Sequence, residues 1–192
     1  MLPFNRLLFQ GTLLGCAALV FITRWIAAPI VPHLFTSDHA IPDPAVPQAG
    51  ASLSPLYPVA IQQWRPLIEQ CAGRYQLDPD IVAAVMLQES AGNAGATSSS
   101  GAVGLMQVMP CDGVAAGFQC NNGPCFADRP SSAELYDPQF NIDYGCRTLR
   151  GLIDHQPSLR DALRAYGPRD SGYAYADLVI SIYERFRSPY PK

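Results

Sequence analysis

Apolar residues recur at three- and four-residue spacing from about residue 60 onward, which is the period of a helix with one buried face. Leu67, Ile68 and Cys71 mark a first helix, with Pro66 in its opening turn. No segment shows a convincing alternation of apolar and polar residues. The pattern therefore predicts one mainly α domain, with at most a small hairpin or irregular loop over residues 113–130.

Two Asp-Pro pairs mark the starts of longer helices, because Asp is a good N-cap and Pro suits the first helical position. Asp78 and Pro79 open a helix that runs to about residue 90. Asp137 and Pro138 open another that ends near residue 155, and one of its faces carries Ile142, Cys146, Leu149 and Ile153. Two further helices are expected at about residues 158–166 and 174–187.

The N-terminal residues 1–28 form a separate apolar segment. An apolar run over residues 7–22 is followed by Arg24 and Trp25, which suit the membrane interface and bring the segment to about 20 residues. We predict a signal anchor that holds the rest of the chain outside the cytoplasm. A cleaved signal peptide is an alternative, and so is a lipid anchor at Cys16, although the residues that follow Cys16 stay apolar where a lipoprotein normally turns polar.

A proline-rich spacer is expected next. Residues 29–58 contain seven prolines and few charges, a composition that favours extended chain over a packed core. The folded domain is then expected to occupy residues 59–192.

Composition narrows the class of partner. Only 15% of residues are charged and the net charge is -3, so the chain lacks the basic surface that nucleic acid needs. Six cysteines are typical of an exported protein, and they favour disulfides over zinc because no CxxC pair or nearby histidine accompanies them. Cys120 with Cys125 is the preferred local pair. We expect no metal and no cofactor.

Glu89 is the main candidate for chemistry. It falls on the same face of its predicted helix as Val82, Val85 and Met86, although folding alone would not place a carboxylate there. Apolar surroundings would raise its pKa from about 4.3 toward about 6, which allows a carboxyl group to donate a proton near neutral pH. Periodicity alone leaves open the alternative that Glu89 is a solvent-exposed residue at the end of the helix.

Three segments resemble the catalytic domain of soluble lytic transglycosylases and goose-type lysozymes. Residues 89–110 read ESAGNAGATSSSGAVGLMQVMP, with the ES pair, the serine- and glycine-rich loop and the GLMQ of that family. Residues 135–153, LYDPQFNIDYGCRTLRGLI, are similar to the family's DP-capped helix, and residues 163–186, LRAYGPRDSGYAYADLVISIYERF, more weakly resemble its AYN-containing stretch. The resemblance spans roughly residues 60–187 and implies a single lysozyme-like domain.

The resemblance also implies a site. Glu89 would be the catalytic residue, and the substrate cleft would be formed by Ser90, Gly104, Leu105, Met106, Gln107 and Tyr166. Some of these have simpler explanations: Ser90 could cap its own helix, and Met106 could pack in the core. Tyr173 and Tyr175 could line the cleft or pack. The family's usual asparagine is replaced by Gly167, which places any role of that amide in doubt.

Glycosidases ordinarily use two carboxylates, but here only Asp112, Asp128 and Glu134, in the cysteine-rich insert, are nearby candidates. The resemblance instead implies that Glu89 alone serves as acid and base and that the substrate's N-acetyl group assists. The expected reaction cleaves the MurNAc–GlcNAc bond of peptidoglycan and leaves a 1,6-anhydro end. The alternatives are hydrolysis, action on a related polymer such as chitin, and a non-catalytic glycan-binding module with envelope assembly partners.

Overall fold

The computed structural model describes residues 52–187. The predicted signal anchor over residues 1–28, the lipid-anchor alternative at Cys16 and most of the predicted spacer lie outside these residues. Within residues 52–187, no helix is long and apolar enough to cross a membrane.

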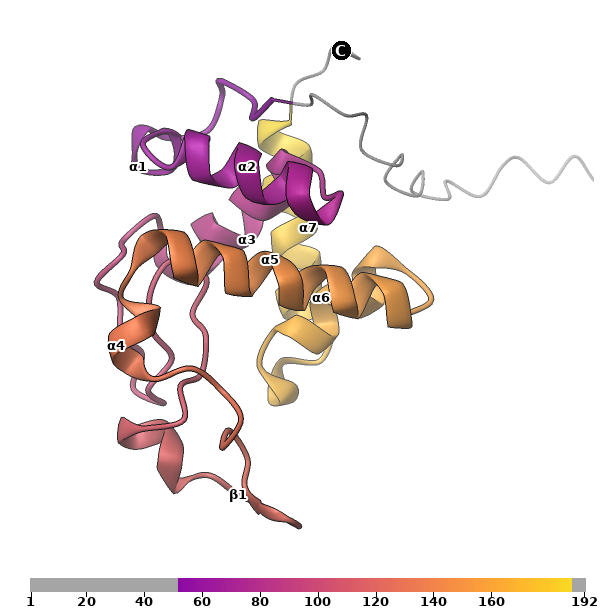
Figure 1. Ribbon diagram of the computed structural model, residues 1–192. Coiled ribbons are helices and arrows are strands. Elements are labelled where there is room, and N and C mark those ends of the chain that lie inside the picture. Colours follow the sequence, from indigo (N-terminus) through magenta and orange to yellow (C-terminus); the bar gives the residue numbers. More distant parts are fainter. Residues whose placement is uncertain (1–51, 188–192) are drawn as a thin grey trace, which may run out of the picture. The chain divides into compact units, whose positions relative to one another are not determined.

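The described part of the chain is mainly helical, as predicted (Figure 1). Each helix expected from the periodicity is present within one or two residues of its expected ends. The helices are α1 (Val59–Gln62), α2 (Arg65–Tyr75), α3 (Pro79–Ser90), α4 (Ser132–Leu135), α5 (Pro138–His155), α6 (Leu159–Tyr166) and α7 (Ala174–Phe186). Two 3-10 turns, η1 (Gly113–Gly117) and η2 (Arg169–Ser171), and a hairpin of β1 (Gln119–Cys120) and β2 (Gly123–Pro124) complete the structure.

Helix α3 is the central helix of the domain. It packs against α7, α2 and α1, and every residue from Pro79 to Met86 is buried. The sequence predicted an apolar face, but α3 is buried on all sides because its first two turns contain apolar residues almost throughout. Its N-terminus is capped by Asp78, whose carboxylate accepts hydrogen bonds from the Asp80 amide (2.9 Å) and from the hydroxyl of Tyr183 on α7 (2.9 Å).

The core extends into the segment that precedes α1. Leu53 and Tyr57 are 1% and 3% exposed. The Asp80 carboxylate accepts a hydrogen bond from the Ser54 amide (2.7 Å), and the Tyr57 hydroxyl donates to the carbonyl of Asp80 (2.6 Å). The short segment 53–57, which precedes the predicted start of the domain at residue 59, thus also packs on the start of α3.

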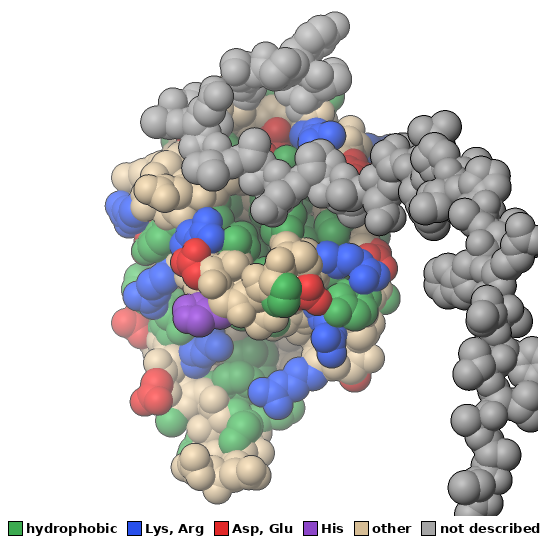
Figure 2. All heavy atoms as spheres, turned by 90° about the vertical axis from the view of Figure 1, so that its right-hand side faces the viewer, with side chains coloured by type: hydrophobic (Ala, Val, Ile, Leu, Met, Phe, Trp, Pro, Cys, Tyr) green, Lys and Arg blue, Asp and Glu red, His purple; other side chains and the backbone are tan. Residues whose placement is uncertain are grey.

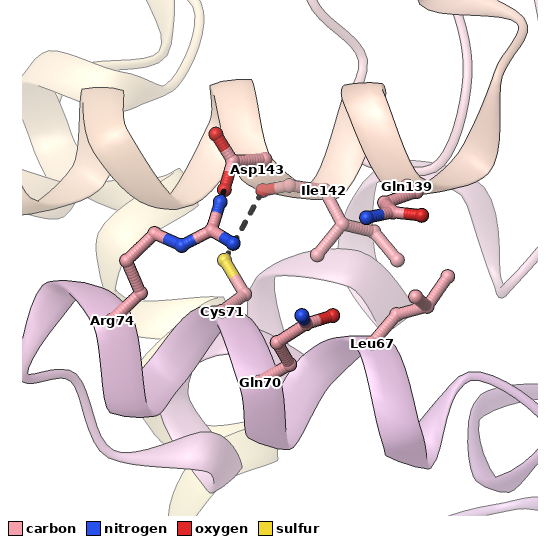
Figure 3. A pocket seen from close by; sticks show the side chains of 7 residues that line it. All are labelled: Leu67, Gln70, Cys71, Arg74, Gln139, Ile142 and Asp143. Carbon is pink, nitrogen blue, oxygen red and sulfur yellow. Dashed lines mark hydrogen bonds and ion pairs between the residues drawn. The ribbon is translucent and has the colours of Figure 1, made fainter.

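A disulfide between Cys71 and Cys146 joins α2 to α5, with Cα atoms 6.4 Å apart. Figure 3 shows the two helices facing each other across a small pocket beside this bridge. Leu67 and Gln70 project from α2 and Gln139 and Ile142 from α5, while Arg74 forms an ion pair with Asp143. The disulfide and the ion pair both fix α5 against α2.

The loop between α3 and α4 is held by one buried amide. Asn141, on α5, is 1% exposed and donates hydrogen bonds to the carbonyls of Val103 and Leu135 (both 2.9 Å), while its oxygen accepts one from the Met106 amide (2.8 Å). Gly104 passes close to this amide with a φ of 79°, and a Cβ there would lie 2.3 Å from the Asn141 nitrogen. The loop therefore requires both Asn141 and a glycine at position 104.

The cysteine-rich insert, residues 111–130, projects away from the helices (Figure 1). Its two ends are joined by a hydrogen bond from the Cys111 amide to the Pro130 carbonyl (2.9 Å). The predicted Cys120–Cys125 disulfide closes its hairpin, and Cys111 is a free thiol. The small hairpin predicted for this region is confirmed.

We expect Asn141→Ala to destabilise the domain by about 2–4 kcal/mol, because it leaves a buried amide and two buried carbonyls without their partner. Urea unfolding measures the loss, and Asn121→Ala, which removes an exposed amide in the hairpin, serves as the matched control. Equal stability of the two variants would contradict the role assigned to Asn141.

The two disulfides are expected to differ in their effect on stability. On the chain-entropy model, a bridge between residues 75 apart contributes about 4.5 kcal/mol and one between residues 5 apart about 2 kcal/mol. Replacing Cys71 and Cys146 by Ala should therefore lower the melting temperature more than replacing Cys120 and Cys125. The reverse order would show that the bridge between α2 and α5 is not the main covalent constraint.

Candidate active site

Glu89 lies in the last turn of α3, where the buried central helix emerges from the core. Its side chain is partly buried, and its Oε1 accepts a hydrogen bond from the hydroxyl of Tyr175 on α7 (2.5 Å). Tyr175 itself is 7% exposed. Both alternatives left open by the sequence are thus partly correct, since Glu89 is at the helix end and is also shielded from water.

This environment favours the protonated form of Glu89. Burial raises the pKa of Glu89 to about 7, and the hydrogen bond from Tyr175 acts in the opposite direction. The C-terminal end of α3 also carries the negative end of the helix dipole, which disfavours a carboxylate. Burial also raises the pKa of the Tyr175 hydroxyl, so Tyr175 remains a hydrogen-bond donor throughout the physiological range. Near neutral pH, Glu89 can therefore both donate and accept a proton.

Gly167 makes room for the tyrosine that contacts Glu89. A Cβ on Gly167 would lie 2.4 Å from ring atoms of Tyr175. The asparagine that the family pattern carries at this position would therefore collide with Tyr175 where its ring lies here. Glycine at position 167, where the family pattern has asparagine, therefore fits the position of the Tyr175 ring.

Several residues predicted to bind substrate hold the loop in place. The side chains of Leu105 and Met106 are fully buried in the core. Gly104 is buried against Asn141, and its lack of a side chain serves packing. The Ser90 hydroxyl lies 2.9 Å from the Leu105 carbonyl and accepts a hydrogen bond from the Gly92 amide (3.2 Å), which ties the end of α3 to the loop. These positions are fixed by the packing of a short loop over the end of a helix.

Gln107 and Tyr166 are the two predicted binding residues that reach a cavity. Both line a hollow of about 170 Å³ beside the loop. The Gln107 side-chain nitrogen donates to the carbonyls of Gly104 (3.0 Å) and Ala96 (3.3 Å), and the Tyr166 hydroxyl donates to the Met106 carbonyl (3.0 Å). The Tyr166 hydroxyl thus bonds to the loop backbone, and Tyr175 is the tyrosine that hydrogen-bonds to Glu89.

Two of the three other carboxylates that the sequence offered, Asp112 and Glu134, are engaged in local structure. Asp112 accepts hydrogen bonds from the amide (2.9 Å) and hydroxyl (2.5 Å) of Ser132, and these bonds lower its pKa. Glu134 forms a capping box with Ser131 at the start of α4, which lowers its pKa as well. Both are therefore ionised helix-capping groups at neutral pH.

Sequence reasoning missed the roles of Tyr175 and Asn141. The sequence allows Tyr175 either to pack in the core or to line the cleft, because a tyrosine at the start of a helix gives no signal of what its hydroxyl contacts. Tyr173, which carried the same expectation, donates instead to Asp161 (2.7 Å). Asn141 directly precedes Ile142, which lies on the predicted core face of its helix. A polar residue beside such a face is a signal that could have indicated a buried side chain with hydrogen-bond partners.

Comparison with known proteins places this site in a family. The family model described as "Transglycosylase SLT domain" matches residues 66–169, more than half of the 192 residues. This range contains Glu89, the loop and Tyr166, and it ends before Tyr175.

Three relatives show what the chain is similar to. "Membrane-bound lytic murein transglycosylase E" of Buchnera aphidicola is 38% identical over 44% of this chain and 37% of its own length. "Transglycosylase" of Enterobacteria phage PRD1 is 36% identical over 54% and 34% of the two chains, and "Endo-type membrane-bound lytic murein transglycosylase A" of Klebsiella pneumoniae is 35% identical over 50% and 45%. The chain thus aligns with less than half the length of these relatives.

Among solved structures, an inactive mutant of the lytic transglycosylase Slt from Pseudomonas aeruginosa aligns with 64% of this chain and 23% of its own, at 23% identity and a TM-score of 0.49. The match to the family model covers α2 to α6 and the loop that follows Glu89, but not α7. The chain therefore belongs to the Transglycosylase SLT domain family.

Proposed function

We propose that this protein is a peptidoglycan lytic transglycosylase that cleaves the β-1,4 bond between MurNAc and GlcNAc, with Glu89 as its sole acid and base. The observation that carries the proposal is a carboxyl group with a pKa raised to about 7 by burial, held by a tyrosine at the end of the central helix. The names of the relatives, which are murein transglycosylases, support the choice of substrate.

The first step uses Glu89 as an acid. Its proton moves to the glycosidic oxygen as the C1–O bond of MurNAc breaks, and the N-acetyl carbonyl oxygen of the same sugar bonds to C1 and stabilises the positive charge. The Glu89 carboxylate that results is stabilised by the Tyr175 hydroxyl. GlcNAc leaves with its hydroxyl restored.

The second step uses the same group as a base. Glu89 takes the proton of the C6 hydroxyl while that oxygen bonds to C1 and displaces the N-acetyl oxygen. The product is a 1,6-anhydroMurNAc end, and Glu89 is protonated again without net addition of water. A single carboxyl group suffices because the substrate supplies the nucleophile of each step, which agrees with the engagement of Asp112 and Glu134 in helix capping.

We place the enzyme in the cell envelope, with the catalytic domain outside the cytoplasm. The Cys71–Cys146 and Cys120–Cys125 disulfides require an oxidising compartment. Two of the relatives are named as membrane-bound, which agrees with the signal anchor expected over residues 1–28. Secretion, or a lipid anchor at Cys16, would give the same location for the catalytic domain.

Glu89→Gln should lower the rate of peptidoglycan cleavage by about 10²–10⁴-fold, because the amide can neither donate nor accept the proton. Purified sacculi are digested and the products weighed by mass spectrometry. Wild-type protein should release anhydroMurNAc ends. Reducing ends in their place would make the protein a hydrolase, and undiminished cleavage by Glu89→Gln would leave Glu89 without a catalytic role.

Glu134→Gln is the matched control, and it should cleave at close to the wild-type rate.

The fold of Glu89→Gln can be checked by its melting temperature at pH 8. A carboxyl group whose pKa is raised in the folded state costs stability as the pH rises from the unfolded value of 4.5 through about 7. The neutral amide avoids that cost, so Glu89→Gln should be at least as stable as the wild type at pH 8.

The pH dependence of kcat/KM should show a falling limb near pH 7, because Glu89 must be protonated in the free enzyme. Tyr175→Phe removes the hydrogen bond that lowers this pKa, so the limb should move to higher pH while the maximal rate falls. A limb that stays in place in Tyr175→Phe would show that another group titrates there.

A further inference from the structure

The cavity beside Tyr166 is formed by four separate segments of the chain. Its walls are the loop residues 107–109, Arg129 from the insert, Thr148 and Leu152 from α5, and Ala165 and Tyr166 from α6. Arg129 is the single charged side chain among these lining residues. The cavity is therefore a mostly neutral hollow with one cation in its wall.

Arg129 differs from the arginines that form ion pairs. Arg65, Arg74, Arg150 and Arg160 each pair with a carboxylate. Within residues 52–187, no Asp or Glu oxygen lies within ion-pair distance of Arg129. Its partner is Tyr144 on α5, whose hydroxyl accepts a hydrogen bond from Nη1 (3.3 Å) and whose ring centroid lies 5.7 Å from the guanidinium carbon. Tyr144 thus orients the guanidinium and leaves most of its donors for another acceptor.

The loop connects this cavity to the candidate active site. The Tyr166 hydroxyl, in the cavity wall, donates a hydrogen bond to the Met106 carbonyl (3.0 Å), and the hydroxyl of Ser90, next to Glu89, lies 2.9 Å from the Leu105 carbonyl. Burial raises the pKa of Tyr166, and the Glu89 carboxylate raises it further. Glu89 and the cavity are thus linked through two successive residues of the loop.

We propose that Arg129 binds a carboxylate carried by the glycan strand, in a subsite formed with Gln107 and Tyr166. This inference rests on the proposed function, because it assigns the substrate of that same site. Peptidoglycan differs from a neutral aminosugar polymer such as chitin in the lactyl ether of MurNAc. The lactyl carboxyl is either free or joined to a peptide stem that carries carboxylates of its own, and a guanidinium binds carboxylates in a two-pronged geometry.

Figure 2 shows basic and acidic side chains interspersed on the side of the molecule that carries α6 and the end of α5 in Figure 1. The blue side chains are arginines, because Lys192 is the single lysine of the sequence and lies outside the described residues. Recognition of a carboxylate would therefore depend on the contact with Arg129.

The competing explanation is that Arg129 merely fastens the insert to α5 through Tyr144. Arg147 provides the matched control because its guanidinium also lies over the Tyr144 ring, 4.7 Å from the centroid, but it does not line the cavity. Both arginines contribute to the environment of Tyr144. Only Arg129 can reach a ligand in the hollow.

The test compares the full-length wild type with Arg129→Gln, Arg129→Lys and Arg147→Gln on three substrates. These are peptide-bearing glycan strands, strands whose peptides have been removed to leave free lactyl carboxylates, and peptide-free strands whose lactyl carboxyl has been converted to a neutral amide. Arg129→Gln should raise KM about tenfold on a carboxylate-bearing substrate, with little change in kcat and no change on the amide strands. Arg129→Lys should recover part of the loss, and Arg147→Gln should behave like the wild type.

The substrate that shows the effect identifies the source of the carboxylate. A loss confined to peptide-bearing strands assigns it to the stem, and a loss on peptide-free strands assigns it to the lactyl group. An equal loss on all three substrates, or no loss on any of them, would overturn the inference. Either result leaves the proposed function intact, whereas that function fails if wild-type protein produces no anhydro ends from any of the strands.

Discussion

A carboxyl group held against an apolar core must either accept hydrogen bonds or keep its proton. Glu89 accepts a hydrogen bond and also has a raised pKa. Burial at the end of α3 raises its pKa to about 7, and the single donor from Tyr175 keeps the ionised form accessible. Several hydrogen-bond donors to the carboxylate would keep the pKa of Glu89 low. With no donor the pKa would rise further, and Glu89 would not readily give up its proton. The proposed chemistry depends on this balance, because one group has to act as acid and then as base.

The rest of the domain positions these two side chains. Helix α3 is buried on all sides through its first two turns, so its last turn is held firmly where it leaves the core. Helix α7 packs along α3 and presents Tyr175, while Gly167 leaves space for the tyrosine ring. The loop beside Glu89 is fixed by Asn141, Ser90 and Tyr166, each through a hydrogen bond to the loop backbone. Ser90 and Tyr166, which the resemblance suggested for substrate binding, thus also hold this loop in place.

The sequence predicted the helices well because their signals are local. Asp78 with Pro79 and Asp137 with Pro138 mark helix starts by capping chemistry that does not depend on the rest of the fold, and both pairs cap helices here. The packing of residues 53–57 could not be predicted, because Ser54 and Tyr57 bond to Asp80, more than twenty residues away. Such contacts leave no periodic signal in a short segment between prolines.

The site was predictable at Glu89 and less so around it. Helical periodicity and the motif both pointed to that residue, but neither could tell that Leu105 and Met106 are buried or that Tyr175 is the partner of Glu89. A side-chain contact across 86 residues is decided by how α7 packs on α3. The sequence carried no signal for Arg129, because an isolated arginine in an irregular insert acquires a role only from the cavity that it lines.

The most direct test of the central claim is a titration of the Glu89 side-chain carboxyl carbon by NMR in the free protein. The account predicts a midpoint near pH 7 that moves upward in Tyr175→Phe. A midpoint near 4.5 would mean that Glu89 is an ordinary ionised surface carboxylate at neutral pH, and it could not then serve as the proton donor.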